Sequence, residues 1–167
     1  MTFHSTHPED LFLDAARKGD VEHLKQAIAS GVELETRDGR GFTALILASY
    51  NEHPEAVKVL LEAKANVNAQ DAGGNTALMG VSFKGYDDIA RLLLENGAKL
   101  DQQTGNGGTA LMFAALFGKN TLVKTLLEYG ADMSIQDARG FTAYGLAVQQ
   151  GNEEALDLFR KHEQQAD

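Results

Sequence analysis

The chain of 167 residues contains no cysteine and only two prolines. Without thiols it cannot hold a disulfide framework, a cysteine-ligated zinc ion or an iron–sulfur cluster, and it has no cysteine nucleophile. So few prolines exclude the collagen-like and proline-rich classes. Hydrophobic residues make up 43% of the chain and charged residues 23%, a composition typical of folded rather than disordered proteins.

Positive charge is also scarce, with 15 Lys and Arg against 24 Asp and Glu, for a net charge of −9 at pH 7. Nucleic-acid phosphates and anionic membranes repel such a chain on average, so we expect neither as a partner. No apolar run approaches the roughly 18–20 residues of a transmembrane helix. The N-terminus, MTFHSTHPED, lacks the basic and apolar regions of a secretory signal. We therefore expect a cytoplasmic protein whose partners carry basic surfaces.

The strongest feature that is present is a repeat. Four segments align without a gap: GFTAL, GNTAL, GGTAL and GFTAY. Their threonines, Thr43, Thr76, Thr109 and Thr142, are 33 residues apart each time. Leucine pairs, alanines and glycines further along each unit keep the same spacing. Self-similarity at a fixed period of this length is typical of stacked repeat proteins.

Within one unit the residues predict a turn, a short helix, a second turn and a longer helix. In the third unit, Asp71 and Gly74 suit the first and fourth positions of a type I turn, and Thr76 follows as a helix N-cap. Gly85 suits the left-handed position after the first helix, and Asp87 opens the second helix at its positive end. Helices this short are marginal alone, so each unit has to bury its apolar face against its neighbours in an elongated stack.

The pattern D-x-x-G-x-T-x-L, followed by A, G, LL and GA, resembles the ankyrin repeat, whose period is also 33 residues. The resemblance implies an all-α ankyrin-repeat solenoid. It would have five stacked helix-turn-helix repeats with β-hairpin loops, of which two are capping repeats and three are inner repeats. A single domain over 8–163 is expected, after a frayed N-terminus at 1–7 and before a tail at 164–167. The expected repeats are 8–37, 38–70, 71–103, 104–136 and 137–163.

A few residues depart from the ankyrin pattern. Thr104 stands where the other hairpins have aspartate, and its hydroxyl mimics that aspartate only weakly. Lys64 and Glu52 stand where other units have the glycines that end their helices. Asn68 resembles a position that is hydroxylated in some animal ankyrin proteins, although a structural role in the return strand explains it more simply.

The two end repeats have the polar outer residues expected of capping repeats. In the first one, Leu11, Phe12 and Ala15 are expected to face inward, with Asp10 and Lys18 outward. The last one ends in the polar stretch FRKHEQQAD. Outer faces that meet water suit the ends of a repeat stack.

The sequence contains no recognisable catalytic or metal-binding constellation. His4 and His7 in HSTH could bind a metal, but a solvated tail explains them, and the other histidines lack a partner at ligand spacing. The glycine-rich stretch TGNGGT lacks the lysine-Ser/Thr ending of a phosphate loop, and there is no G-x-S-x-G motif. We therefore expect no enzymatic activity, no cofactor and no metal.

Residues that the repeat does not require are the candidates for function. In ankyrin proteins the hairpin tips and the ends of the first helices line a concave surface that binds partners. Here Tyr50, Phe83, Leu116 and Phe117 form an apolar row across three units, and exposed rows of this kind often mark interfaces. The candidate partner-binding residues are Arg40, Phe42, Tyr50, Asn75, Phe83, Lys84, Leu116, Phe117, Arg139 and Phe141.

The family resemblance implies a non-enzymatic protein–protein interaction module, expected to be a monomer, that binds another protein through the concave face of the stack. Such a module would act by occupying its partner, as an inhibitor, an immunity or protection factor, or an assembly aid. Two alternatives stay open. One is a self-associating structural protein in which the apolar row forms a dimer seam. The other is a small-molecule-binding accessory of an enzyme, which would need a deep pocket with converging polar groups.

Overall fold

The computed structural model describes residues 6–166, and in that range it contains ten α-helices and no β-strand. The helices form five pairs, so the predicted all-α repeat fold is confirmed. A short turn joins the two helices of each pair, and a longer loop leads to the next pair. The helices are α1 (Pro8–Lys18), α2 (Val21–Ala29), α3 (Ala44–Tyr50), α4 (Pro54–Glu62), α5 (Ala77–Lys84), α6 (Asp87–Glu95), α7 (Ala110–Leu116), α8 (Asn120–Glu128), α9 (Ala143–Gln150) and α10 (Glu153–Gln165).

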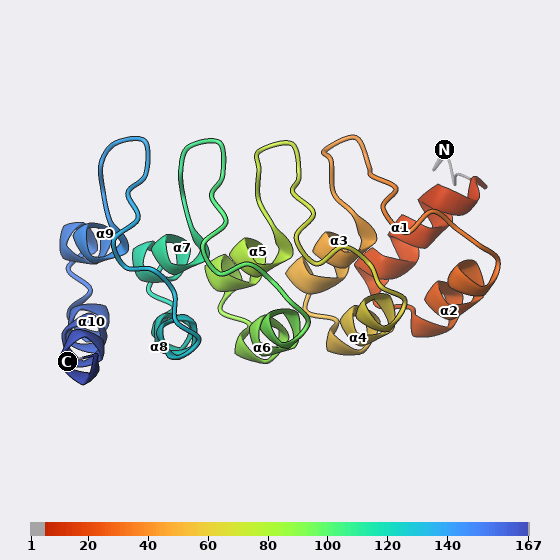
Figure 1. The fold of residues 1–167 in the computed structure, drawn as a ribbon. Helices are drawn as coiled ribbons and strands as arrows, with labels where there is room; N and C mark the ends of the chain where they lie inside the picture. The colour runs from red at the N-terminus through yellow and green to blue at the C-terminus, as the bar shows by residue number, and fades with distance from the viewer. Residues whose placement is uncertain (1–5, 167) are drawn as a thin grey trace.

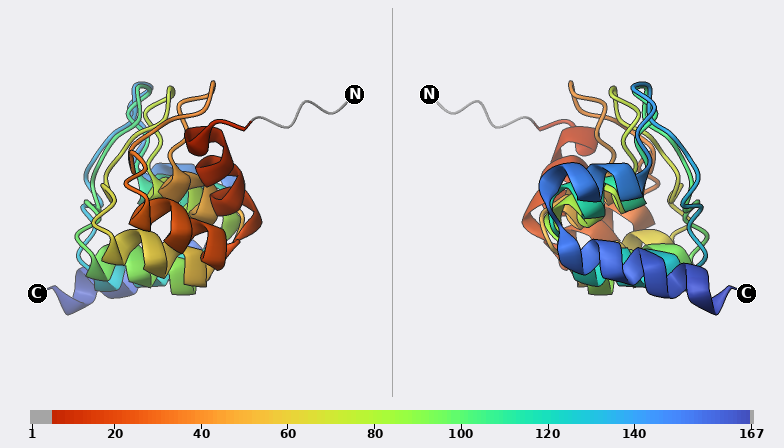
Figure 2. Two further views of the ribbon diagram at one scale, coloured as in Figure 1. Left: turned by 90° about the vertical axis from the view of Figure 1, so that its right-hand side faces the viewer. Right: turned by 90° about the vertical axis from the view of Figure 1, so that its left-hand side faces the viewer.

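The helices lie in two rows that run the length of the molecule. The first helices of the pairs form one row and the second helices form the other (Figure 1). Each first helix packs against the first helices of neighbouring repeats and against the second helix of its own repeat. Views along the stack show two layers of helices with the long loops projecting together on one side (Figure 2). The molecule is therefore a linear stack with nearest-neighbour contacts.

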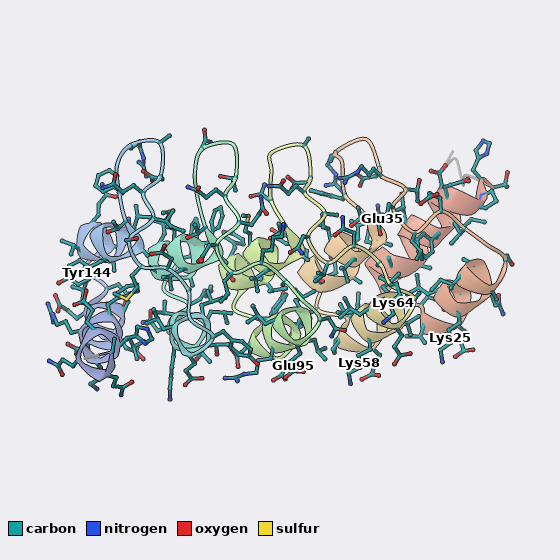
Figure 3. All side chains as sticks on the ribbon, viewed as in Figure 1. Lys25, Glu35, Lys58, Lys64, Glu95 and Tyr144 are labelled. Atoms are coloured by element: carbon teal, nitrogen blue, oxygen red, sulfur yellow. The ribbon has the colours of Figure 1, made fainter. Side chains whose placement is uncertain are left out.

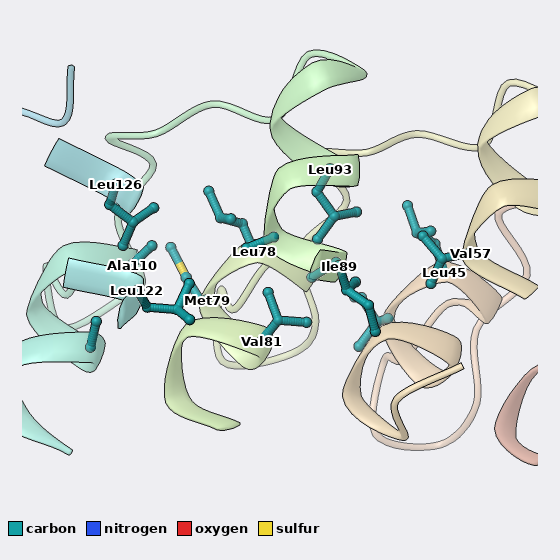
Figure 4. Packing of buried hydrophobic residues seen from close by; sticks show 14 of the residues in the cluster. Leu45, Val57, Leu78, Met79, Val81, Ile89, Leu93, Ala110, Leu122 and Leu126 are labelled. Carbon is teal, nitrogen blue, oxygen red and sulfur yellow. The ribbon is translucent and has the colours of Figure 1, made fainter. Parts of the chain in front are cut away.

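Side chains from neighbouring repeats build the core together as a strip between the two rows. Equivalent leucines of successive first helices, such as Leu45 and Leu78, are at most 2% exposed, and Leu60 and Leu93 of the second helices are fully buried. Figure 4 shows labelled members of this strip from three neighbouring repeats. Because each repeat completes its neighbour's core, no repeat has an apolar core of its own.

The first helices after α1 begin at the threonines that define the repeat. The Oγ1 atoms of Thr43, Thr76, Thr109 and Thr142 accept hydrogen bonds of 3.1–3.3 Å from the backbone N–H three residues further on. Each threonine has extended backbone angles. The predicted N-caps are therefore confirmed, and they satisfy first-turn donors that have no partner inside the helix.

The long loops are hairpin-like turns organised by one side chain each. Asp71 Oδ1 accepts hydrogen bonds of 2.9 Å from the N–H groups of Gly73 and Asn75. In the next loop Thr104 Oγ1 accepts only from the N–H of Gly108, at 3.1 Å. The threonine is thus the weaker substitute that the sequence predicted, because it satisfies one donor where aspartate satisfies two.

Side chains of the return segments connect each repeat to the next. Gln70 Nε2 donates to the carbonyl of Gly74 in its own loop at 2.8 Å and to the carbonyl of Gln103 in the next at 3.2 Å. Asn68 Oδ1 accepts from the N–H of Lys99 at 2.8 Å, across the same junction. Asn68 is therefore a structural residue, in agreement with the simpler interpretation of the sequence.

The ends of the chain differ in part from the expectation. Residues 1–5 of the expected frayed N-terminus lie outside the described residues, as does Asp167. Helix α1 begins at Pro8, after a short extended segment. Helix α10 continues to Gln165, so it extends into the segment that was expected to be a tail.

The prediction that Leu11 faces inward was wrong. Leu11 is 54% exposed, whereas Phe12 and Ala15 are buried as predicted. At the repeat spacing Leu11 corresponds to Ala44, which is fully buried in a helix that packs against α1 of the preceding repeat. Within the described residues no repeat precedes α1, so this position of the helix meets solvent.

Candidate functional site

Three aromatic side chains meet at the ends of the first helices. Tyr50 ends α3, Phe83 lies in the last turn of α5, and Phe117 follows α7. The rings of Tyr50 and Phe83 are stacked with their centroids 6.4 Å apart, and Phe83 meets Phe117 edge-on at 4.6 Å. Tyr50 is 42% exposed and Phe117 is 46% exposed. These three residues, hereafter the aromatic trio, form one continuous aromatic surface over three repeats.

Leu116, the fourth member of the predicted apolar row, lies beneath this surface and not on it. It is half-buried and packs against the hydrophobic core. Consecutive helical residues point about 100° apart, so Leu116 and Phe117 face different directions. The aromatic surface therefore passes from Phe83 to Phe117, and Leu116 contributes to it only through packing.

A groove of about 530 Å³ runs beside the aromatic trio, between the first helices and the hairpins. Tyr50 and Phe83 of the trio form part of its apolar lining together with Phe42, while Arg40 and Asn75 supply polar groups from the hairpins. The surface is therefore amphipathic, with an apolar floor on the helix side and polar groups on the loop side.

A second groove of about 580 Å³ continues along the stack towards α9. It shares Asn75 and Phe113 with the first groove, and Leu116 and Arg139 also line it. The two grooves, hereafter the hairpin groove, thus extend from the end of α1 to the last repeat. They lie between the hairpins and the row of first helices, whose arrangement Figure 2 shows.

Aromatic rings hold three cationic side chains at this surface. Each cation lies over the face of a ring, where the ring's quadrupole attracts it. The contact also restricts the long side chain, so less conformational entropy is lost when a ligand binds. The pairs are Arg40 over Phe42 at 4.5 Å, Arg139 over Phe141 at 5.1 Å, and Lys84 Nζ over Tyr50 at 4.8 Å, each measured to the ring centroid.

The aspartates beside the two arginines are bound inside their turns. Burial alone would raise the pKa of Asp38, but hydrogen bonds from the N–H groups of Phe42 and Arg40 outweigh it and hold this pKa below its usual value. The pKa of Asp137 is lowered for the same reasons, by the N–H groups of Phe141 and Arg139 against the effect of burial. Both carboxylates are therefore ionised at neutral pH and committed to the backbone.

Three residues at the groove escaped the sequence analysis. Arg17 lines the groove and corresponds to Tyr50 one repeat earlier, so one more step of 33 residues would have found it. Gly80 and Phe113 occupy a position that is leucine in the neighbouring repeats. A Cβ atom at Gly80 would lie 3.3 Å from Tyr50 Cδ2, so the missing side chain makes room for the Tyr50 ring. A comparison of this position across the repeats would have shown that Gly80 and Phe113 depart from leucine.

The described part of the chain shows neither a metal-binding cluster nor a membrane-spanning helix. Within residues 6–166 no group of three or more His, Asp or Glu side chains could hold a metal ion. His4, one of the two histidines considered for a metal, lies outside this range. None of the described helices is both long enough and apolar enough to cross a lipid bilayer. The glycine-rich stretch at 104–109 forms one of the hairpins.

The fold and this surface define a class: a helical-repeat solenoid whose hairpins and first helices leave an open groove. A family model described as ankyrin repeats (three copies) matches residues 12–104 and 98–167. The chain belongs to the ankyrin-repeat family, so the resemblance seen in the sequence is confirmed. Ankyrin repeats are generally protein–protein interaction modules, and the family is typically non-enzymatic.

Several named proteins share segments of similar sequence with this chain. A protein of Escherichia coli (strain K12) named as the ankyrin repeat protein YahD is 39% identical over 61 residues, which are 36% of this chain and 30% of that protein. Ankyrin repeat domain-containing protein 29 of Danio rerio is 43% identical over 55 residues, 32% of this chain and 18% of its own length. The mitochondrial disaggregase of Bos taurus is 34% identical over 56 residues, 34% of this chain and 8% of its own. The similarity thus spans less than a third of each relative.

Proposed function

We propose that this protein binds a partner protein through the hairpin groove and that the aromatic trio anchors the complex. One observation carries the proposal: three neighbouring repeats place their aromatic rings side by side on the surface, where two of them are more than 40% exposed. An aromatic side chain can bury about 150–250 Å² in a contact, and residues of this kind dominate the binding energy of protein interfaces.

The mechanism of binding is recognition by a preformed surface. The trio lies at the ends of short helices that neighbouring repeats hold in place, and the cations from the hairpins and from α5 rest on aromatic rings. A partner therefore meets side chains that are already ordered, and the entropic cost of docking is low. The groove spans repeats that only a stack brings together, so the surface depends on the stack as a whole.

The proposed role is to occupy a partner without changing it chemically, as an inhibitor, a protection factor or an assembly aid. The family is typically non-enzymatic, which supports a role by binding alone. The groove is open and lies along several repeats, which suits a polypeptide better than a metabolite.

Affinity capture with matched variants tests the proposed function. The wild-type chain and its Phe83→Ala and Tyr129→Ala variants are immobilised and incubated with extract from the native cell, and retained proteins are identified by mass spectrometry. Tyr129 is the control because it is an exposed aromatic residue at the end of α8, in the other helix row. We expect a protein that wild type and Tyr129→Ala retain and Phe83→Ala does not.

Equal retention by all three matrices would rule out the trio as the binding surface. A melting-temperature shift with metabolites, and no retained protein, would favour the small-molecule alternative. A wild-type chain that elutes as a dimer and becomes monomeric on Phe83→Ala substitution would favour the dimer seam.

A further inference from the structure

The charge of the hairpin groove is opposite to that of the whole chain. The chain carries a net charge of −9, yet the charged residues that line the groove are Arg17, Arg40, Arg139, Asp71 and Asp137. Beside the groove, Lys84 adds a cation over the Tyr50 ring, and Asp38 adds an anion that pairs with Arg40 and Arg17. The groove therefore carries slightly more positive than negative charge, whereas the whole chain is negative.

The aspartates at the groove are already bound by the protein itself. Asp71 Oδ1 accepts hydrogen bonds from two backbone N–H groups and from the Asn75 amide. The side chain of Asp137 is only 10% exposed and accepts from two backbone N–H groups. A ligand in the groove therefore meets few acceptors that are free to bind its cationic groups.

The arginines, in contrast, face outward with most of their donors unused. The side chains of Arg40 and Arg139 are 66% and 62% exposed. Each makes one contact of 3.3–3.4 Å to the aspartate two residues earlier, which leaves most of its five N–H donors available. Both guanidinium groups rest on a phenylalanine ring, so they are held at the rim of the groove.

The two arginines occupy equivalent places three repeats apart. Both stand in the sequence Arg-Gly-Phe-Thr-Ala, at 40–44 and 139–143. The two hairpins between them present Ala72, Gly73, Gly105 and Asn106 at their tips, which carry no charge. Between the arginines the helix side of the groove presents Phe83 and Phe113. The groove is thus cationic at its two ends and apolar in the middle.

We propose that the occupant of the hairpin groove is an acidic polypeptide segment with an apolar centre. Its carboxylates would pair with Arg40 and Arg139, and its apolar side chains would contact Phe83 and Phe113. Planar guanidinium groups match carboxylates in charge and geometry. This inference rests on the proposed function and adds the chemistry of the partner to it. Because the arginines line the groove, an acidic segment replaces the basic surface that the net charge of the whole chain had led us to expect.

A single-stranded nucleic acid is the less suitable anionic occupant. It carries a charge at every nucleotide and needs a groove whose cations follow its backbone. Here the cations stand at the ends of the groove and the tips between them are uncharged. The acidic side chains of the second helices, such as Glu95 at the edge of the stack in Figure 3, add a repulsion that a short acidic peptide feels less.

A peptide selection tests the inference and does not require an identified partner. A display library of random linear peptides, long enough to cross three repeats, is panned on the immobilised full chain, and enriched peptides are synthesised for titration. We expect enrichment of Asp and Glu on both sides of aromatic or aliphatic residues. Arg40→Gln and Arg139→Gln should each lower the affinity of these peptides about tenfold. Arg160→Gln on α10, with the same change of charge, should leave it unchanged.

Each outcome decides between the two proposals. Enriched peptides that are apolar or basic, and that depend on Phe83 but not on the arginines, would overturn the inference and leave the proposed function standing. Peptides that bind Phe83→Ala as well as wild type, or no enrichment at all, would overturn both. Binding of single-stranded oligo-dT that competes with the peptides and is lost in Arg40→Gln would replace the acidic polypeptide by a nucleic acid.

Discussion

At the scale of single residues, the glycine that closes each hairpin shows how tightly neighbouring loops pack. Gly107 and Gly140 occupy the same place in successive repeats, with φ of 81° and 85°. A Cβ atom on Gly107 would lie 3.0 Å from Asp137 Cα and 3.1 Å from Ala138 N, whereas one on Gly140 would meet nothing within 4 Å. The two glycines therefore share a backbone conformation, but only Gly107 has the next hairpin packed against it.

Alanine substitution at these two glycines separates conformational strain from loop packing. Gly140→Ala should lower the free energy of unfolding by about 1 kcal/mol, because alanine disfavours positive φ. Gly107→Ala should cost about 1–3 kcal/mol more, since the next hairpin has to move. Urea denaturation followed by circular dichroism measures both values. Equal destabilisation would show that the hairpins do not pack as described.

Protonation of the turn aspartates should weaken the stack in acid. The pKa values of Asp38 and Asp137 are lowered in the folded chain, so their contribution to stability is present above the unfolded-state value near 3.9 and is lost as the pH falls through and below it. We expect the free energy of unfolding to begin to fall near pH 5 and to keep falling as the pH drops below the unfolded-state pKa towards the lower folded values. In the double variant Asp38→Asn, Asp137→Asn this fall should be smaller. If the free energy of unfolding depended on pH as in the wild type, the two aspartates would not be its source.

At the scale of whole helices, two helix ends carry a strain that the other repeats avoid. Glu52 and Lys64 have φ of 60° and 70°, at places where other repeats have glycine in the same conformation. In the folded chain, a left-handed conformation costs a residue other than glycine roughly 1–2 kcal/mol. Substitution by glycine removes this cost, but it also increases the conformational entropy of the unfolded chain, which offsets part of the gain.

Glycine at either helix end should therefore stabilise the protein. We expect Glu52→Gly and Lys64→Gly each to raise the free energy of unfolding by about 0.5–1 kcal/mol, measured by urea denaturation. Lys64→Ala is the control, because it removes the lysine side chain and keeps the unfavourable backbone. If alanine stabilised as much as glycine, the side chain and not the backbone would be the cause.

The helices were predictable from the sequence because their signals are local. Thr76 and Gly85 mark the ends of α5 through hydrogen bonds and backbone angles that involve only nearby residues. The direction of Leu11 and the packing of Leu116 were not predictable in this way, because both depend on which repeat lies next to them. The sequence placed Phe83 and Phe117 in one row. Their edge-on ring contact is offset by one position from the strict repeat, so its geometry came only from the structure.

At the scale of the whole molecule, the end of the stack bears on its association state. Leu11 is exposed at a position where the later repeats have alanines that are at most 2% exposed. A further repeat in register would have to accommodate a leucine in place of alanine, and such overpacking disfavours stacking of one chain on another.

We therefore expect no end-to-end stacking of chains, and a monomer in solution where the groove is occupied by another protein and not by a second copy. Size-exclusion chromatography with light scattering should give the mass of a single chain at micromolar concentrations. A mass that doubles with concentration would contradict this prediction. The Phe83→Ala and Leu11→Ala variants would then show whether the groove or the end of the stack forms the contact.

Titration of the captured partner measures directly whether binding depends on the rings exposed along the first helices. Calorimetry would compare wild type, Phe83→Ala and Tyr129→Ala, with thermal unfolding as the check that all three are folded. We predict that Phe83→Ala loses about 2 kcal/mol of binding free energy, roughly a thirtyfold increase in Kd, and that Tyr129→Ala loses none. Equal affinity of Phe83→Ala and wild type for the partner would show that the aromatic trio does not anchor the complex.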